Sequence, residues 1–545
     1  MPISLLREAR WISLVVVLAF CQPRLAHALK TAEVPRDAQT AATQGATLEQ
    51  GHQWRDAIDY YETALKKFPE DATLTYGLRR AKIHFSIERR YSDESFKQSM
   101  LHLSRHDALE LYDAILDRIR GNYVDEISTT SVVAHGTESL WLALSNEKFV
   151  AQHLFGADPK RIKQLKDLLF QRYWNKPVYY REGARQIVNE IADKSRELLG
   201  LSDSAVVMEF VFGACNCLDD YSSVLTPSRN DDLHDNMKGE FVGIGIVMEA
   251  ELGKGMALRN VLPESPASES GLRPGDHLTR INGHDCRFMT TEEAAGLLTG
   301  SPGSRVDLSV SSPRRTEAQD ISCVRRKVEV RSVPVAKIID AERGIAYIQQ
   351  TGFQESTAFE MQMTLHKLNR EGMRSLIWDV RGNPGGLLQQ AADVLDLFIE
   401  AGVLVSTKGR TPDQNQQFTA HAPGTWDIPL VLIIDENSAS ASEIVAGAVR
   451  DHRRGTIVGR KSYGKWSVQS IYPVRGGTGL RLTTAKFLSP NGHWLSKIGV
   501  APDVKVEWPE DSDFIRPLGD VDLAQDLDLT KALDVIRNAQ TVSSR

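Results

Sequence analysis

The chain has 545 residues, of which 41% are hydrophobic and 25% charged, a composition typical of a soluble protein with about three or four domains. Its formal net charge is −6, its isoelectric point is near 6.2, and its basic residues are dispersed. These values argue against a nucleic acid as the partner.

The N-terminus carries the features of an export signal. Arg7 and Arg10 precede an apolar segment at residues 11–20, and a small residue, a histidine and a second small residue follow at 26–28. This pattern predicts a signal peptide at residues 1–28 and an exported, periplasmic or extracytoplasmic protein, with or without membrane association. An uncleaved anchor is the alternative, but about ten apolar residues are short for crossing a bilayer. A lipoprotein signal ending at Cys21 is disfavoured because Phe20 is large for that position.

Residues 38–100 have a repeat-like character. The positions that a 34-residue tetratricopeptide repeat gives to small, aromatic and terminating residues are occupied by Gly45, Ala57, Tyr61, Ala64 and Pro69. An ordinary helical hairpin is the alternative. Because one repeat cannot bury its own apolar face, we expect this region to stack on the following helices or on a protein partner.

Residues 101–237 are expected to form a helical arm or platform. Helical periodicity with many charged residues extends over 107–144 and again over 160–199, which is typical of amphipathic helices.

A strand, a turn and a helix are predicted around Ser440. The apolar run at 429–434 is typical of a buried strand, and the residues from Ala441 to 449 have helical spacing. Ser440 is therefore expected at a helix N-terminus, where free backbone N–H groups stabilise a developing oxyanion. The rival interpretation is structural, because Ser440 with Glu443 is also a capping box.

Lys465 is the candidate base for this serine. A lysine activates a serine when surrounding apolar groups lower its pKa by roughly 2 to 3 units from about 10.4. Apolar neighbours of Lys465 in the sequence could exclude water, and Gln469 could orient the amine. A solvated surface lysine is the alternative, and Lys461 is an equally visible rival.

A glycine-rich turn is predicted between a strand at 375–380 and a helix at 387–400. Residues 382–386 read Gly-Asn-Pro-Gly-Gly, so backbone N–H groups at a helix N-terminus offer an anion site. A phosphate loop is the rival, but the turn lacks a following Gly-Lys-Ser/Thr and a Gly-x-Gly-x-x-Gly spacing. Nucleotide binding is therefore disfavoured.

Several motifs together resemble the carboxyl-terminal processing proteases, also called tail-specific proteases. The resemblance covers roughly residues 105–540, with a poorer match near 145–205. The motifs that carry it are Ser-Ala-Ser-Ala-Ser-Glu at 438–443, Tyr-Gly-Lys-Trp-Ser-Val-Gln at 463–469, Asp-Val-Arg-Gly-Asn-Pro-Gly-Gly at 379–386, Leu-Asp-Asp-Tyr-Ser-Ser-Val-Leu-Thr-Pro at 218–227, and Lys-Ile-Gly-Val-Ala-Pro-Asp-Val at 497–504.

The resemblance implies a serine endopeptidase with defined site residues. It places the nucleophile at Ser440, the base at Lys465 and the orienting amide at Gln469. The oxyanion hole would be the backbone N–H of Ala441 plus one from the turn at Gly385 and Gly386. Two positions depart from the family pattern: Asn437 and Trp466 each stand where glycine is usual.

Residues 238–312 resemble a PDZ domain. The segment Gly243, Ile244, Gly245 and Ile246 would present backbone N–H groups to a peptide carboxylate, followed by an edge strand to which an extended chain can add. Residues 291–298 are expected to form the helix beside that strand. Such a domain implies protein or peptide substrates with exposed C-termini.

The predicted fold class is α/β and multidomain: a helical N-terminal region with a tetratricopeptide-like repeat, a PDZ domain and an α/β serine protease core. The expected divisions are 1–28 signal peptide, 38–100 repeat-like helical region, 101–237 helical arm, 238–312 PDZ domain, 313–510 protease core and 511–545 C-terminal helical tail.

The function predicted is that of an exported serine endopeptidase that recognises C-termini and uses no cofactor. Neither a Cys-x-x-Cys pair nor a His-Glu-x-x-His motif occurs, so a metal site is not expected. One alternative is a catalytically silent PDZ and helical-repeat scaffold in which Trp466 blocks the site. A more remote alternative is another carbonyl-chemistry enzyme that reuses the same sheet and turn.

Overall fold

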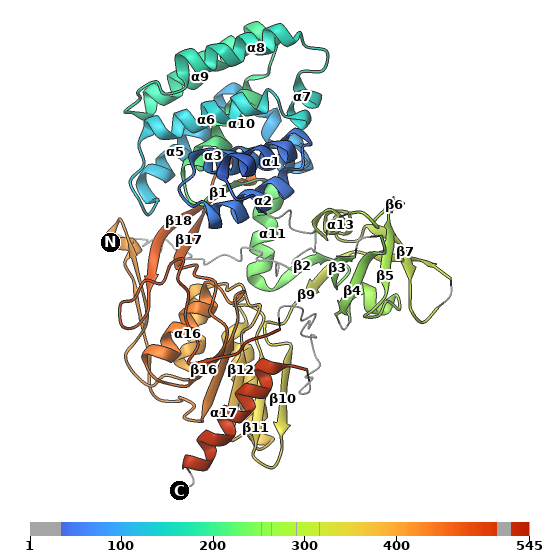
Figure 1. The fold of residues 1–545 in the computed structure, drawn as a ribbon, viewed down its shortest axis with the longest axis vertical. Coiled ribbons are helices and arrows are strands. Elements are labelled where there is room, and N and C mark those ends of the chain that lie inside the picture. Colours follow the sequence, from blue (N-terminus) through green and yellow to red (C-terminus); the bar gives the residue numbers. More distant parts are fainter. Residues whose placement is uncertain are drawn as a thin grey trace, which may run out of the picture.

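The structure, a computed structural model, describes residues 34–509, apart from 252, 263, 290 and 316, and residues 525–543. The predicted signal peptide lies outside the described residues. Figure 1 shows a group of helices from the N-terminal half at one end, a small sheet to one side and a helix-covered sheet at the other end.

The N-terminal half is helical, and side chains cap most of its helix starts. Asp37, Asp71, Ser104 and Ser128 each accept a backbone N–H bond from the first turn that follows. The helices are α1 (Ala38–Gln50), α2 (Trp54–Lys67), α3 (Ala72–Tyr91), α4 (Glu94–Gln98), α5 (Arg105–Asn122), α6 (Thr129–Ala143), α7 (Glu147–His153), α8 (Pro159–Leu168), α9 (Arg181–Leu199), α10 (Asp203–Gly213) and α11 (Pro227–Lys238), with short turns η1 (Met100–His102), η2 (Leu169–Tyr173) and η3 (Ala214–Cys217).

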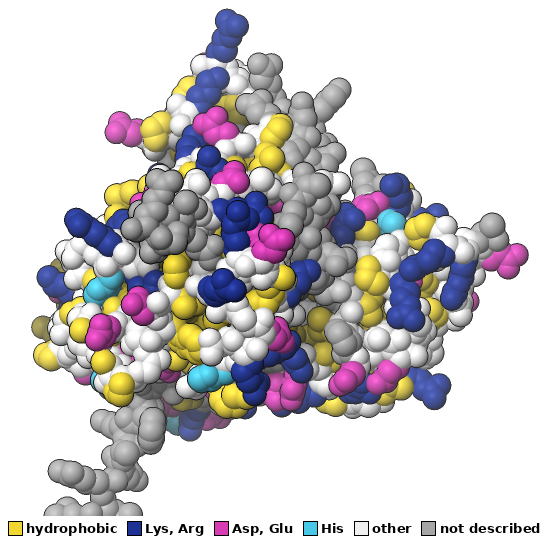
Figure 2. All heavy atoms as spheres, turned by 90° about the horizontal axis from the view of Figure 1, so that it is seen from below, with side chains coloured by type: hydrophobic (Ala, Val, Ile, Leu, Met, Phe, Trp, Pro, Cys, Tyr) yellow, Lys and Arg dark blue, Asp and Glu magenta, His cyan; other side chains and the backbone are white. Residues whose placement is uncertain are grey.

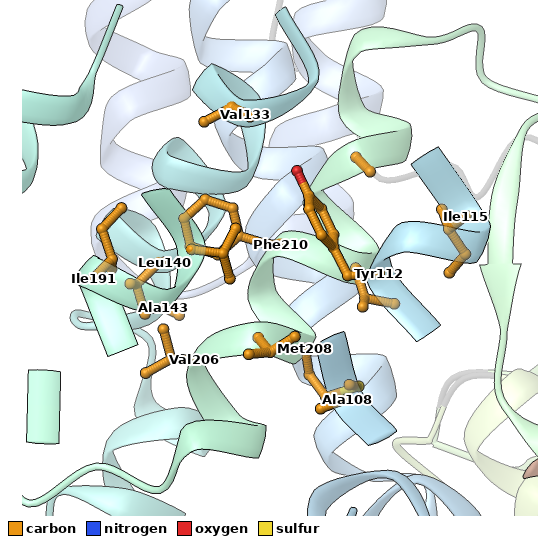
Figure 3. Packing of buried hydrophobic residues seen from close by; sticks show 14 of the residues in the cluster. Ala108, Tyr112, Ile115, Val133, Leu140, Ala143, Ile191, Val206, Met208 and Phe210 are labelled. Atoms are coloured by element: carbon orange, nitrogen blue, oxygen red, sulfur yellow. The ribbon is translucent and has the colours of Figure 1, made fainter. Parts of the chain in front are cut away.

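Helix α10 forms the centre of this helical part. Most of its residues are apolar and buried, with Glu209 as a buried charged exception, as expected for a helix surrounded by others. Figure 3 shows its Val206, Met208 and Phe210 among side chains of α5, α6 and α9. The sequence periodicity over 107–144 and 160–199 therefore reflects helices that pack around a central apolar one.

Helices α1 and α2 form a hairpin that α3 continues. The ring of Tyr61 lies against Gly45 and Gly77, where an added Cβ would come within 2.3 and 2.4 Å of it. Small residues at these positions are thus required by the close approach of the ring. A tetratricopeptide-like repeat and an ordinary helical hairpin share this arrangement, so the repeat stays a prediction.

A small antiparallel sheet follows α11. A two-stranded ribbon, β2 (Glu240–Gly243) with β9 (Arg326–Glu329), connects it to the rest of the chain. The sheet order is β3-β4-β5-β7-β8, so β3 lies at an edge, and helix α13 packs beside it. The elements are β3 (Ile246–Glu251), β4 (Gly255–Val261), α12 (Pro266–Glu269), β5 (His277–Ile281), β6 (His284–Asp285), α13 (Thr291–Leu298), β7 (Arg305–Ser311) and β8 (Gln319–Val324).

The C-terminal half is built on a six-stranded sheet. Its order is β10 (Val335–Asp340), β11 (Ile345–Gln349), β12 (Ser375–Asp379), β15 (Leu430–Ile434), β16 (Thr456–Gly459) and β19 (Val504–Lys505), parallel except for the first pair. Strands β11, β12 and β15 are buried on both faces, which explains their continuous apolar runs.

Helices cover both faces of this sheet. On one face, α14 (Thr357–Arg370), α15 (Leu388–Asp396) and α16 (Ala441–Asp451) pack on alternate strand residues such as Leu376 and Trp378. On the other face, α17 (Leu527–Ser543) packs on the intervening residues, including Ile377. The carboxyl ends of the neighbouring parallel strands β12 and β15 lie at the same edge, where the two predicted turns meet.

A second sheet joins the two halves of the chain. Strand β1 (Ser223–Leu225) pairs with β18 (Gly479–Leu488), which also pairs with β13 (Val403–Gly409) and β17 (Ser467–Pro473), and β14 (Gln417–Thr419) closes the edge. Further bonds reach the helical part: Val124 N donates to Thr483 O at 2.9 Å, and Gln414 Nε2 donates to Asn122 O at 2.8 Å.

The surface carries charges of both signs. Figure 2 shows Lys and Arg side chains interspersed with Asp and Glu side chains on the face seen from below in Figure 1. None of the helices in the described residues combines the length and apolar character needed to cross a bilayer.

Candidate active site

Ser440 occupies a strained position at the start of α16. Its backbone has φ 57° and ψ −113°, a conformation that non-glycine residues rarely adopt and that clusters at functional sites. Strand β15 ends at Ile434 and α16 begins at Ala441, so this serine lies at a sharp strand-to-helix turn. Such a turn presents a serine hydroxyl beside helix N-terminal N–H groups.

The hydroxyl of Ser440 lies in the arrangement of a capping box with Glu443 but forms no capping hydrogen bond. Its Oγ is buried and has no hydrogen-bond partner within the described chain. The other half of the capping box is present, since Glu443 Oε2 accepts the Ser440 N–H at 2.9 Å. A buried polar atom without a partner calls for a functional explanation, so this geometry favours the nucleophile over the capping interpretation.

Glu443 connects the backbones of the two predicted dyad residues. Its Oε2 accepts the N–H of Ser440 and also the N–H of Lys465, at 2.9 and 2.7 Å. Its Oε1 accepts from Ser462 Oγ at 2.6 Å and from Gly464 N at 2.7 Å. Burial raises the pKa of the Glu443 carboxyl, while these donors act in the opposite direction.

The glycine-rich turn lies directly against Ser440. A Cβ added to Gly385 would come within 2.8 Å of Ser440 Cβ and of Ala441 N. Gly385 N itself donates to Asn383 Oδ1 at 2.9 Å, so it is already engaged. Among the described residues Ala441 N and Gly386 N make no hydrogen bond, so of the predicted oxyanion donors these two are available.

Lys465 is buried, whereas its rival Lys461 is exposed. The Lys465 ammonium lies 4.8 Å from the centre of the Tyr221 ring, a cation–π contact. Because Ser440 Oγ has no partner, the ammonium and the hydroxyl are not hydrogen-bonded here. The structure thus brings the predicted nucleophile and base to one buried region without joining them.

Gln469 lies on β17 where the pairing with β18 shifts. Val468 pairs with Ala485 and Gln469 with Thr483, an irregularity that re-aims the glutamine side chain. Its Nε2 donates to Ser467 Oγ at 2.9 Å and to Thr483 Oγ1 at 3.2 Å. Its buried Oε1 makes no hydrogen bond within the described residues, so it is placed to accept one from an amine.

Trp466 is directed into the core behind α16. Its ring lies 4.7 Å from that of Phe487, and its Nε1 donates to Glu443 Oε1 at 3.3 Å. The Gly447 position of α16 is also close, since a Cβ there would come 3.1 Å from the indole. An indole that fills the core in this way does not support the alternative in which Trp466 blocks the site.

The predicted carboxylate-binding segment leads into the edge strand β3. Gly245 has φ 79°, and an added Cβ there would meet Ser265 Cβ at 2.3 Å, so glycine is required. Ile244 is buried in the core of the small sheet, and Ile246 begins β3. The segment therefore stands at the end of an unpaired strand edge.

Two groups near the site were not identified from the sequence. Tyr221 belongs to the segment at 218–227, but nothing in a sequence pattern shows that its ring meets Lys465. Asp526 and Asp528 bind Arg381, which immediately precedes the glycine-rich turn, and they lie far along the chain. Only tertiary contacts could have revealed these partners.

Comparison with known families matches two segments of the chain. The profile of peptidase family S41 matches residues 344–506, which hold Ser440, Lys465 and the glycine-rich turn. The profile of the PDZ domain matches residues 258–311. A serine at a strand-to-helix turn, beside a glycine-rich turn and within an S41 match, defines a serine-type peptidase.

Individual relatives agree with this class. A carboxy-terminal-processing protease of Bartonella bacilliformis is 35% identical over 314 residues, which are 56% of this chain and 71% of that protein. A carboxyl-terminal-processing protease of Synechocystis sp. is 31% identical over 330 residues, 60% of this chain and 75% of that protein. The chain therefore belongs to peptidase family S41, as a member of the carboxy-terminal-processing proteases.

Among solved structures, a photosystem II D1 C-terminal processing protease has 23% identity, with 74% of this chain and 95% of that chain covered. The TM-score is 0.39, which does not relate the two overall arrangements.

Proposed function

We propose that this protein is an exported endopeptidase that cleaves unfolded protein chains with a Ser440–Lys465 dyad and selects them by their C-termini. The observation that carries the proposal is the buried hydroxyl of Ser440, which is held on a strained backbone and has no hydrogen-bond partner among the described residues. Membership of peptidase family S41 supplies the reaction class, which is peptide-bond hydrolysis, and the proposed dyad assigns its nucleophile and base.

In the first step, the neutral amine of Lys465 takes the proton of Ser440 as Oγ attacks the substrate carbonyl carbon. The carbonyl oxygen becomes an oxyanion, which the N–H groups of Ala441 and Gly386 stabilise. The lysine then gives its proton to the leaving amine, and an acyl-serine remains. Water, deprotonated by the same lysine, hydrolyses this ester and restores the hydroxyl. Gln469 Oε1 accepts a hydrogen bond from the lysine and orients it.

The described conformation must change before this reaction occurs. Ser440 is 0% and Lys465 3% exposed, so a substrate carbonyl cannot reach them directly. The lysine amine must also come within about 3.2 Å of Ser440 Oγ to take its proton. We therefore assign this structure to a resting state of the enzyme.

The remaining parts are assigned to substrate handling and export. Residues 238–312 act as a PDZ domain whose segment Gly243–Ile246 and strand β3 receive a chain terminus, which the edge position of β3 supports. Residues 38–100 act as a tetratricopeptide-like module and residues 101–237 as a platform, with a protein partner on the former. Residues 313–510 form the protease core, apart from β8 and β9, which belong to the small sheet and its ribbon; residues 511–545 are its tail, and residues 1–28 direct export.

The test compares substitutions of the dyad with a matched surface lysine. Ser440→Ala and Lys465→Ala should each lower cleavage of unfolded casein by at least about a thousandfold, while Lys461→Ala keeps wild-type turnover. Because dyad members act as a unit, the double variant should be scarcely slower than either single one. Circular dichroism melts establish that the variants are folded. Near-normal turnover by Lys465→Ala would contradict the assignment of the base.

A further inference from the structure

The C-terminal helix α17 meets the active-site edge of the sheet through one buried arginine. Arg381 is 4% exposed and immediately precedes the glycine-rich turn. Its Nε and Nη2 donate to Asp379, its Nη1 and Nη2 donate to Asp526 at 2.8 and 2.7 Å, and its Nη1 also donates to Asp528 at 3.0 Å. All five N–H donors of the guanidinium therefore reach carboxylate oxygens.

Two of these three carboxylates come from the start of α17. Asp526 Oδ1 also accepts the N–H of Leu529 at 3.0 Å, so Asp526 caps this helix while it binds Arg381. Asp528 is shared with Arg460, whose Nη1 lies 2.7 Å from Asp528 Oδ2. Burial alone would lower the pKa of Arg381, but Asp379 and Asp526 hold that pKa well above its usual range.

The backbone after Arg381 contacts residues on both sides of Ser440. Asn383 O accepts the N–H of Ala439 at 3.0 Å and the hydroxyl of Ser442 at 2.9 Å. Gly385, two residues on, lies against Ser440 itself. A displacement of Arg381 would therefore move the turn at 382–386, which contacts the nucleophile.

We propose that α17 supports the active site. Asp526 and Asp528 bind Arg381 and thereby fix the position of the turn at 382–386 relative to Ser440. They are positioning residues, since they touch neither substrate nor reacting atoms. The proposal deepens the function proposed above, because it takes Ser440 and this turn as the reaction site.

The physical reason is the cost of a buried guanidinium without enough acceptors. With both aspartates neutral, Arg381 loses two of the three carboxylates that bind it among the described residues, and the loss of one side of a buried ion pair is strongly destabilising. The arginine must then move toward water, and its backbone moves with it. The apolar face of α17, with Leu529, Leu533 and Ile536 on the sheet, keeps the helix docked meanwhile.

The test compares Asp526→Asn/Asp528→Asn with Arg537→Gln in the full chain. Arg537 also attaches α17 to the sheet, through Asp340 at 2.9 Å, and this attachment lies away from the turn at 382–386. We expect the double aspartate variant to lower kcat on casein at least tenfold, with KM within twofold, and Arg537→Gln to leave kcat within twofold. Amide hydrogen exchange of the segment 382–387 should quicken at least tenfold in the first variant only.

Unchanged kcat and exchange in a folded double aspartate variant would overturn the proposal, as would an equal loss of kcat in Arg537→Gln. If the double variant does not fold, Asp526→Asn and Asp528→Asn are measured singly, with the same expected direction. Ser440→Ala separates the two proposals. If it retains cleavage, the assigned nucleophile is wrong; if it abolishes cleavage while the α17 variants act normally, only the role of α17 is wrong.

Discussion

The unusual backbone conformation of Ser440 is imposed by hydrogen bonds from the residues around it. Positive φ in a non-glycine residue costs about 1 to 3 kcal/mol and persists only where neighbouring contacts impose it. Here Glu443 Oε2 holds the Ser440 N–H, and Asn383 O holds the N–H of Ala439. The strain is therefore maintained by the same groups that place the hydroxyl beside the oxyanion donors.

Gly385 offers a sharp test of this arrangement. A Cβ at this position would meet Ala439 O, Ala441 N and Ser440 Cβ, each at 2.8 Å, so Gly385→Ala must push the turn away from the nucleophile. We expect casein cleavage to fall at least about a hundredfold, the scale of a lost oxyanion contact.

Gly372→Ala is the matched control for this substitution. Gly372 has φ 96°, comparable with φ 105° at Gly385, but a Cβ there would meet nothing within 4 Å. Both variants carry the strain of a left-handed alanine, roughly 1 to 2 kcal/mol. Gly385→Ala carries the cost of its clashes in addition, so its melting temperature should fall further than that of Gly372→Ala. Only Gly385→Ala should lose activity, and wild-type activity in that variant would show that the turn does not form the site.

At the scale of elements, helices α2 and α3 hold a buried histidine that resists protonation. His84 of α3 stacks on Trp54 of α2 with ring centres 4.2 Å apart, and its Nδ1 lies 3.3 Å from Asn146 Nδ2. Burial lowers the pKa of His84 to about 4. The neutral imidazole is thus part of the packing between the first helices and the helical platform.

This lowered pKa predicts an acid-sensitive N-terminal region. In the unfolded chain a histidine has its ordinary pKa of about 6.5, so the unfolded state binds a proton first as the pH falls. The contribution of His84 to folding is complete above pH 6.5 and is lost between pH 6.5 and 4, by up to about 3 kcal/mol.

His84→Phe keeps an aromatic ring on Trp54 but cannot titrate. We expect denaturant unfolding, followed by circular dichroism at pH 7 and pH 4.5, to show a smaller loss on acidification in His84→Phe than in the wild type. His106→Phe, at an exposed position, should behave like the wild type. Equal acid sensitivity in the wild type and His84→Phe would show that His84 does not cause the loss of stability at low pH.

At the scale of the whole molecule, the two-stranded ribbon of β2 and β9 connects the small sheet to the rest of the chain, and a short turn could join its two strands directly. Gly243 of β2 and Arg326 of β9 are directly paired. The chain therefore enters and leaves the small sheet at this pair of residues. An Asn-Gly turn joined to these two residues would replace the small sheet and keep the ribbon. The nucleophile, the base and the glycine-rich turn lie outside the replaced segment.

Substrate selection by C-termini can be measured with this replacement. The full chain should cut casein with an apolar C-terminal tail faster than casein with an acidic tail, because added charge must be desolvated and the apolar side chain loses its pocket. Replacing residues 244–325 with Asn-Gly should bring the ratio of the two rates to about one. A ratio that survives the replacement would locate selection elsewhere, such as in the N-terminal helices.

The sequence predicted the local elements of the catalytic half well. The strand before Ser440 and the helix after it were expected at 429–434 and from Ala441, and they are β15 and α16. Continuous apolar runs and a glycine-rich turn are local signals, so these predictions needed no long-range contact. The roles of Ser440, Lys465 and Gln469 were inferred from the local sequence pattern together with the family resemblance, and they stay predictions until the dyad is tested.

By itself, the sequence determined which family this chain belongs to and where its strands, turns and candidate catalytic residues lie, because motif spacing and periodicity are local properties. Only the tertiary structure decided how those residues are held. It placed Tyr221 against Lys465, directed Trp466 into the core, and joined Arg381 to Asp526 and Asp528. These contacts link distant parts of the chain, and a buried charge finds its partners through packing rather than through sequence proximity.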